Sequence, residues 1–402
     1  MNQIDKPSAF AVNNLQAGEA RMDVASQWAA RPADQRFLSL SDMHAKRLAD
    51  AQGRQSVTID ATKVEVIAPE PRSLADTHRL AVGLPDGTVT APTNWAFNQL
   101  AQRVKAPAAY LRRLPSQIVA DNLNWGLRRE RGEEGGLGAY HDNASGGQLH
   151  ALTGAKYGRI FDHEVIAAVQ QVAGNGTGDA RWKVPGVMDW STMVYDPDVP
   201  VSEHTTTLFA SDRDMFVFLV DDKNPIEVGK VRNPKTGALE PDVMFRGFYV
   251  TNSEVGNSSL KLAAFYLRGV CCNRILWGVE QFQEVTMRHS SRAPSRFVHE
   301  TTPALRNFAE GSAQTLIEGV QAAKAAKLAS DDDDALAFLR GRGFSKAKAA
   351  QIFERVEIEE GTKPRTVWDF AQGITAAARA EINTDTRFAM EGEARKILDK
   401  VA

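Results

Sequence analysis

Apolar residues recur at helical spacing in several stretches of the chain. The clearest stretch covers residues 93–104, where five apolar side chains fall on one helical face: Trp95, Phe97, Leu100, Ala101 and Val104. Two short helices are expected to follow it, opened by Pro107 and by Ser116. The same spacing predicts helices over residues 162–172, 258–277, 303–328 and 335–402.

Short β-branched and aromatic runs between turn residues indicate strands. The expected strands cover residues 57–67, 149–160, 192–195, 205–209, 215–220, 243–251 and 281–287. Asp, Asn, Gly and Pro clusters separate most of these runs, as antiparallel strands require. The glycine-rich stretch 131–147 is expected to be a loop. The pattern predicts an α+β fold, with a central, mostly antiparallel sheet, packed helices and a helical C-terminal region.

The same pattern divides the chain into three parts. Residues 1–55 are expected to be a peripheral helical segment, residues 56–300 an α+β core, and residues 301–402 a helical region. A length of 402 residues fits two or three domains, and a hydrophobic content of 43% is enough for a sizeable core.

Charge and cysteine content narrow the classes of function. The 48 basic and 50 acidic side chains give a net charge of -2, which excludes a uniformly basic nucleic-acid coat but not a local basic face. The two cysteines, Cys271 and Cys272, are adjacent, which rules out a relaxed disulfide and a zinc site built from cysteine pairs. The chain has no secretion-signal pattern at its start and no apolar run long enough to span a bilayer. We therefore expect a cytoplasmic protein with no membrane partner.

Basic side chains concentrate in two stretches, residues 102–131 with a net charge of +5 and residues 257–307 with a net charge of +4. Aromatic residues lie near them: Trp95, Tyr110, Trp125, Tyr157 and Tyr266. A positive track combined with stacking aromatic rings is typical of proteins that bind single strands. We expect the cations to gather along one concave surface. The candidate nucleic-acid-binding residues are Arg128, Arg129, Lys156, Tyr157, Arg159, Lys261, Arg268, Arg288, His289 and Arg292.

One segment stands out, where a strand runs into a turn that ends at Gly256. Gly256 is expected at positive φ, and the predicted helix over 258–277 begins just after it. The free N–H groups of that helix would hold an anion such as a phosphate, with Lys261 near its first turn. In the alternative interpretation, Asn252 and Ser253 cap the helix and Glu254 complements its dipole.

This segment and several others resemble, in order, the signature of a phage- and plasmid-borne family, the domain-of-unknown-function 932 family. The resemblance covers roughly residues 93–400. Its most specific pieces are Thr251–Gly256 and Val270–Asn273, and the family-motif residues are Asn252, Ser253, Glu254, Gly256, Cys271 and Asn273. The resemblance implies a mobile-element setting and a mixed fold. It implies no reaction, so no catalytic residue is assigned.

These observations predict a mobile-element accessory protein that binds single-stranded DNA or assists annealing and recombination. We expect it to need no cofactor and to form a homo-oligomer. The tail adds one feature, because Leu339–Lys348 resembles a helix-hairpin-helix element, whose glycine loop contacts DNA phosphates. In the alternative interpretation, this stretch is only the start of a helix capped by Ser345.

Two other classes of function stay open. One is a metal-dependent nucleic-acid-processing enzyme, in which Asp196 with Asp198, or Asp212 with Asp214, would bind Mg²⁺ from one face of a strand. Both pairs border predicted turns, where Asp is favoured anyway, so no metal site is assigned and a binding protein is favoured over an enzyme. The other is a non-catalytic anti-defence or regulatory protein that acts through protein contacts.

Overall fold

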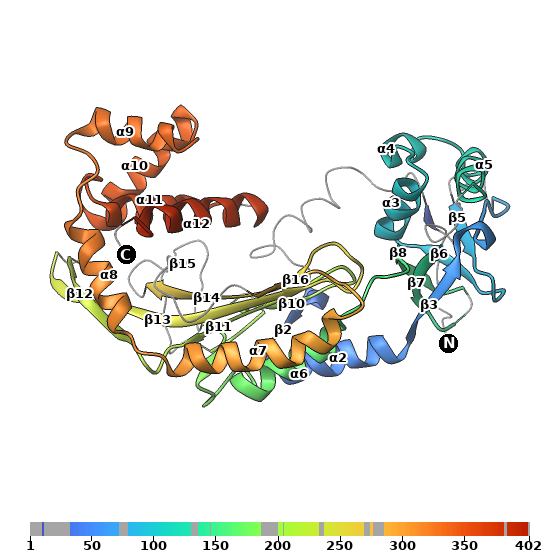
Figure 1. Cartoon of the computed structure of the whole chain (residues 1–402), viewed down its shortest axis with the longest axis horizontal. Coiled ribbons are helices and arrows are strands. Elements are labelled where there is room, and N and C mark those ends of the chain that lie inside the picture. Colours follow the sequence, from blue (N-terminus) through green and yellow to red (C-terminus); the bar gives the residue numbers. More distant parts are fainter. Residues whose placement is uncertain are drawn as a thin grey trace.

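The computed structural model has the predicted α+β architecture (Figure 1). It describes residues 10–11, 33–71, 79–129, 136–144, 146–185, 200–203, 205–232, 237–268, 274–275, 285–381 and 384–400. Within them, two mostly antiparallel sheets are accompanied by packed helices and a helical C-terminal region, which confirms the predicted fold class. None of the helices in these ranges combines the length and apolarity that crossing a membrane requires.

The smaller sheet, sheet A, belongs to an N-terminal lobe. Its strands follow the order β1-β5-β6-β8-β7-β3, with β4 paired to β5. Their bounds are β1 (Phe10–Ala11), β3 (Arg54–Asp60), β4 (Glu65–Ile67), β5 (Arg79–Gly83), β6 (Val89–Pro92), β7 (Gly136–Asp142) and β8 (Gln148–Gly154). All described pairs are antiparallel except that of β6 with β8.

Helices α3 (Asn94–Arg103) and α5 (Ser116–Leu127) of this lobe pack on sheet A, and α4 (Ala108–Leu111) packs against α3 (Figure 1). The prediction of α3 is confirmed, because Thr93 caps it and Phe97 and Leu100 are buried in the core beneath it. Leu123 of α5 enters the same core. The helices therefore stand on sheet A through the apolar face that the sequence spacing indicated.

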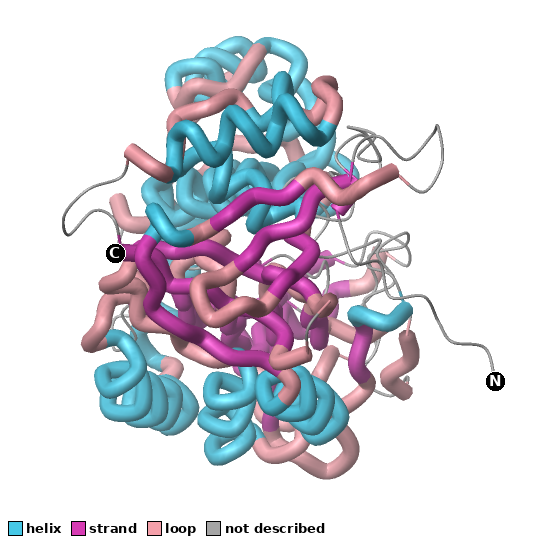
Figure 2. The backbone as a smooth tube through the Cα atoms, turned by 90° about the vertical axis from the view of Figure 1, so that its right-hand side faces the viewer, coloured by secondary structure: helices cyan, strands magenta, loops and turns pink. Residues whose placement is uncertain are grey.

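The larger sheet, sheet B, follows the order β15-β14-β13-β11-β10-β2. Three more strands join it at the side: β12 pairs with β13, β16 with β14, and β9 with β11. Its strands are β2 (Arg36–Phe37), β9 (Trp182–Lys183), β10 (Leu208–Ala210), β11 (Met215–Asp221), β12 (Ile226–Arg232), β13 (Leu239–Asn252), β14 (Leu260–Arg268), β15 (Arg274–Ile275) and β16 (Val285–Met287). Every residue of β11 is buried, because Val217 faces one core and Phe218 faces another on the opposite side. Helices lie on both sides of the strands (Figure 2).

Helices α2 (Leu40–Gln52), α6 (Asp162–Ala173) and α7 (Ala293–Glu310) run along one side of sheet B (Figure 1). The prediction of a helix over residues 162–172 is confirmed. The prediction that the N-terminal helix would be peripheral is wrong, because Leu40, Met43 and Arg47 of α2 are buried. These three residues share one face, with which α2 packs against α6.

The C-terminal region is helical as predicted. It consists of α8 (Gln314–Ala325), α9 (Asp332–Gly341), α10 (Lys346–Glu360), α11 (Val367–Arg379) and α12 (Thr384–Leu398). The single helix expected over residues 303–328 is the end of α7 followed by α8, with the break at Gly311. The acidic run that begins at Asp331 opens α9, because the Asp331 side chain accepts a hydrogen bond from the backbone N–H of Asp334.

Two predicted elements differ from the structure. The apolar run expected as a helix over residues 258–277 contains β14, which is buried on both faces and therefore shows no alternation. A short run of this kind has the same appearance in a buried helix and in a buried strand. The loop expected over residues 131–147 contains β7, whose pairing with both β3 and β8 outweighs the low strand propensity of its glycines. The strand expected over 192–195 lies outside the described residues.

Candidate nucleic-acid interface

The motif Thr251–Gly256 lies at the end of β13 and in the turn after it. Glu254 is 3% exposed. Its carboxylate accepts hydrogen bonds from Tyr140 Oη (2.9 Å) and from the backbone N–H of Asp162 (2.8 Å). Arg47 Nη2 lies 3.4 Å from the same carboxylate. Both oxygens of Glu254 are therefore engaged inside the protein.

A second carboxylate, that of Asp162 at the start of α6, belongs to the same cluster. It accepts a hydrogen bond from Asn252 Nδ2 at 2.8 Å and lies 3.3 Å from Arg47 Nε. Burial raises the pKa of Asp162 well above its ordinary value, and the charge of Glu254 raises it further, whereas Arg47 lowers it. Two buried carboxylates thus share one buried guanidinium, an arrangement that holds three segments of the chain together.

The main chain of the motif attaches the N-terminal lobe to sheet B. The carbonyl oxygen of Val255 accepts hydrogen bonds from Trp95 Nε1 (2.9 Å) and Gln99 Nε2 (2.8 Å), both on α3. The carbonyl oxygen of Ser253 accepts one from Tyr157 Oη (3.0 Å). The motif is therefore a junction between the two sheets, and we call it the lobe junction.

The predicted anion site at the start of a helix after Gly256 is wrong, because the chain continues into β14 instead. The positive φ expected for Gly256 is confirmed at 84°. Ser253 caps no helix, and its Oγ accepts a hydrogen bond from the backbone N–H of Asn257 and so holds a turn. The other two family-motif residues, Cys271 and Asn273, lie outside the described residues.

Two of the predicted nucleic-acid-binding cations lie in the interior. Arg268 is 1% exposed, and its Nε and Nη2 lie 2.7 and 3.0 Å from the carboxylate of Asp242. Its third nitrogen pairs with Glu360, and Lys324 Nζ lies 2.7 Å from Asp242. Arg159 is buried and donates to a backbone carbonyl of the lobe junction. The prediction that these two arginines line an open groove is wrong, because a polynucleotide cannot reach them in the folded protein.

Tyr157 and His289 are packed against each other at the lobe junction. Their rings stack with centroids 4.9 Å apart and an angle of 7° between the planes. Burial lowers the pKa of His289 to about 4, so the ring is neutral at physiological pH. His289, one of the candidate nucleic-acid-binding residues, therefore offers a phosphate no positive charge at that pH.

Four other predicted cations come together at the end of sheet B beside the lobe junction. The pairing of β14 with β16 brings Lys261 close to Arg288 along the neighbouring strand. A backbone bridge between the segments that follow β8 and β16 brings Lys156 to the stretch that holds Arg288 and Arg292. We call Lys156, Lys261, Arg288 and Arg292 the basic edge.

The three segments that form the basic edge carry an excess of positive charge. Residues 149–161, 255–262 and 285–297 contain six Lys or Arg residues and no Asp or Glu, and two of the six are engaged elsewhere, because Arg159 is buried and Arg296 pairs with Glu300. The side chains of Lys156, Arg288 and Arg292 are exposed. A local excess of exposed cations creates a positive potential even in a chain with a small negative net charge. The backbone pairing thus brings the segments that carry these four predicted binding residues next to one another.

Arg128 and Arg129 follow α5 in the N-terminal lobe, on a different element from the basic edge. Both are exposed. The guanidinium of Arg129 lies over the ring of Trp125, 4.2 Å from its centroid. The predicted single surface is thus divided between the basic edge and the end of α5, with Arg159 and Arg268 in the interior.

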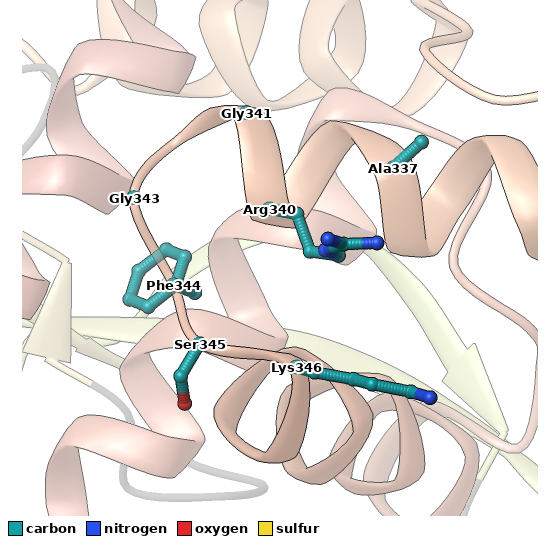
Figure 3. A pocket seen from close by; sticks show the side chains of 7 residues that line it. All are labelled: Ala337, Arg340, Gly341, Gly343, Phe344, Ser345 and Lys346. Atoms are coloured by element: carbon teal, nitrogen blue, oxygen red, sulfur yellow. The ribbon is translucent and has the colours of Figure 1, made fainter.

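The stretch that resembles a helix-hairpin-helix element forms the turn between α9 and α10. Ser345 Oγ accepts a hydrogen bond from the backbone N–H of Lys348 at 3.2 Å and caps α10, as in the alternative interpretation. A surface pocket of about 610 Å³ lies at this turn, and the side chains of Arg340 and Lys346 extend to the same side of it (Figure 3). The pocket lining includes no buried polar side chain, so we assign it no ligand.

The acidic pair Asp212 and Asp214 forms the turn between β10 and β11. Asp214 accepts a hydrogen bond from Ser211 Oγ at 2.9 Å, which is the ordinary role of Asp in a turn. Among the described residues, no group of three or more His, Cys, Asp or Glu is placed to hold a metal ion. Asp196 and Asp198 lie outside those residues.

Sequence reasoning missed two partners of the lobe junction, Arg47 and Tyr140. Arg47 carried a usable signal, because it follows Leu40 and Met43 at helical spacing and so falls on the apolar face of α2. A charged residue on such a face indicates a buried partner. Tyr140 carried no such signal, because its stretch has the composition of a loop.

Comparison with known proteins gives one match. No curated protein and no solved structure matches the chain. The family model described as Domain of unknown function (DUF932) matches residues 202–394, which include most of sheet B, the motif Thr251–Gly256 and the C-terminal helices. Sheet A lies outside the matched region. Over residues 202–394, the chain is therefore similar to the DUF932 family, a shorter range than the resemblance over residues 93–400 implied.

Proposed function

We propose that the protein binds single-stranded nucleic acid through the basic edge, as an accessory factor in mobile-element annealing or recombination. The observation that carries this proposal is the convergence of Lys156, Lys261, Arg288 and Arg292 from three distant parts of the chain. Contacts between phosphates and Lys or Arg supply most of the sequence-independent affinity for nucleic acids. The resemblance to a phage- and plasmid-borne family supports the setting.

The neighbourhood of the basic edge offers further groups suited to phosphate oxygens. Ser290 and Ser291 are exposed between the two arginines and carry hydroxyl donors. Helix α7 begins directly after Arg292, and the positive end of its dipole points toward the same place. Cations, hydroxyl donors and a helix start together favour binding of a phosphate backbone over recognition of a base sequence.

Salt dependence of binding tests the proposal. We would measure fluorescence anisotropy of a labelled oligothymidine from about 50 to about 200 mM salt with the wild type and with Arg288→Ala/Arg292→Ala. Each lost contact lowers the slope of log K against log salt by about 0.7 on a single strand, so the double variant should lose about 1.4.

A matched control changes the net charge equally at another place. Lys230 on β12 and Arg395 on α12 are both exposed, and Lys230→Ala/Arg395→Ala should leave the slope unchanged. Lack of wild-type binding at the lowest salt would contradict the proposal. An equal loss of slope in the control variant would also contradict it, because the effect would then come from net charge alone.

A further inference from the structure

A tryptophan stands on the surface of the N-terminal lobe. Trp125 of α5 is 65% exposed, the largest exposed fraction among the big apolar side chains of the described residues. Tryptophan is highly buried on average in folded proteins. Arg129, one helical turn later, lies over its ring. The guanidinium covers one face of the ring, and the planar pair that results is a suitable surface for another flat, electron-rich group.

The backbone beneath Trp125 is held in place by close packing. A Cβ atom at Gly126 would overlap the side chain of Val104, so the end of α3 lies directly against α5. Lys105 follows Val104 and has a φ of 58°, which residues other than glycine rarely adopt. Glycine is the usual residue at such a helix end, and here an exposed cation occupies it, next to the helix that carries Trp125.

The helical layer around Trp125 is positively charged. Residues 94–129 contain six Lys or Arg residues and one acidic residue, Asp121, which accepts a hydrogen bond from Gln117. Arg113 and Arg128 of this layer are exposed. This charge complements a polyanion, and the exposed ring complements a base, so single-stranded nucleic acid satisfies both features at once.

We propose that Trp125 and Arg129 form a stacking platform for the unpaired bases of single-stranded nucleic acid. This inference rests on the proposed function and specifies that bases as well as phosphates are bound. The bases of a duplex already stack on one another, so only a single strand can use the ring. Helix α3 connects the lobe junction, next to the basic edge, with the layer that carries Trp125. Trp95 in the first turn of α3 donates a hydrogen bond to the lobe junction. The ten residues of α3 then span about 15 Å, and Lys105 follows the end of the helix.

Oligonucleotides with and without bases test the platform. We would measure anisotropy of a labelled oligothymidine and of an abasic strand with the same number of phosphates, using wild type, Trp125→Ala and Trp125→Phe. Trp125→Ala should weaken binding of oligothymidine by about 5- to 150-fold, the range of one lost stacking contact. It should change binding of the abasic strand by less than about twofold, and Trp125→Phe should restore most of the affinity for oligothymidine.

Ile118 supplies the matched control, because it is 51% exposed on the same helix. Ile118→Ala should bind both strands as the wild type does. If Trp125→Ala weakens binding of both strands equally, or weakens binding of neither, the platform is overturned. The proposed function still stands in that case, provided that the wild type binds. If the wild type binds neither strand, the proposed function fails and the platform fails with it. Loss of a dimer in Trp125→Ala, measured by sedimentation, would assign the ring to a protein contact and overturn the platform.

Discussion

Arg268 and Arg288 are both candidate nucleic-acid-binding residues, and the structure places the first in the interior and the second on the surface. Arg268 is 1% exposed and holds the fully buried carboxylate of Asp242 through two nitrogens. Arg268→Met keeps most of the side-chain volume but removes the buried guanidinium from Asp242, whose carboxylate then keeps its pair with Lys324, a partly exposed side chain. Breaking a buried ion pair from one side costs about 3–5 kcal/mol. We therefore expect Arg268→Met to lower the free energy of unfolding by about 4 kcal/mol.

Urea unfolding, followed by far-ultraviolet circular dichroism, measures this loss. The nucleic-acid affinity of folded Arg268→Met and its salt dependence should match the wild type. Arg288→Ala should give the reverse result, with a stability change below about 0.5 kcal/mol because the side chain is exposed. The reasoning is refuted if Arg268→Met unfolds at the wild-type urea concentration and loses salt-dependent binding instead.

Three further changes test the packing near the two surfaces. The unfolded chain takes up a proton at His289 near pH 6.5 whereas the folded chain does so only near pH 4. Wild-type stability should therefore fall by about 2 kcal/mol between pH 7 and pH 5, and urea titrations of His289→Phe should lack this part of the fall. Lys105→Gly should raise the free energy of unfolding by about 1 kcal/mol by relieving the positive φ, and a lower urea midpoint would contradict this. Gly158→Ala would place a Cβ atom on the backbone of Ser290 and should lower the free energy of unfolding by about 3 kcal/mol, measured by urea titration. Gly154→Ala, which has open space around its Cβ, should change that free energy by less than about 0.5 kcal/mol.

Local signals in the sequence predicted local structure well. The apolar spacing after Thr93 specifies α3, and Ser345 specifies the start of α10. β14 was missed because a strand covered on both faces has no period that distinguishes it from a helix. Its assignment depends on pairing with β13 and β16, which the sequence of β14 does not encode alone.

The candidate site was predictable only in part for the same reason. Composition indicated which residues are cations but not which of them meet a carboxylate. Arg268 is buried because Asp242 and Glu360 lie next to it after folding, at separations of 26 and 92 residues in the sequence. Arg288 stays exposed because no Asp or Glu occurs in the segments paired around it. Whether the chain forms a homo-oligomer stays a prediction.

The hydrogen bonds that α3 and Tyr157 donate to the lobe junction end on main-chain oxygen atoms. Trp95 and Gln99 both donate to the carbonyl of Val255, an atom that every amino acid at that position would provide. Replacing Val255 by another residue that fits the turn leaves both anchor points intact, whereas replacing either donor removes one. The Val255 side chain is itself buried beside Tyr140 and Ala151, so packing and not the two hydrogen bonds limits which residues this position accepts.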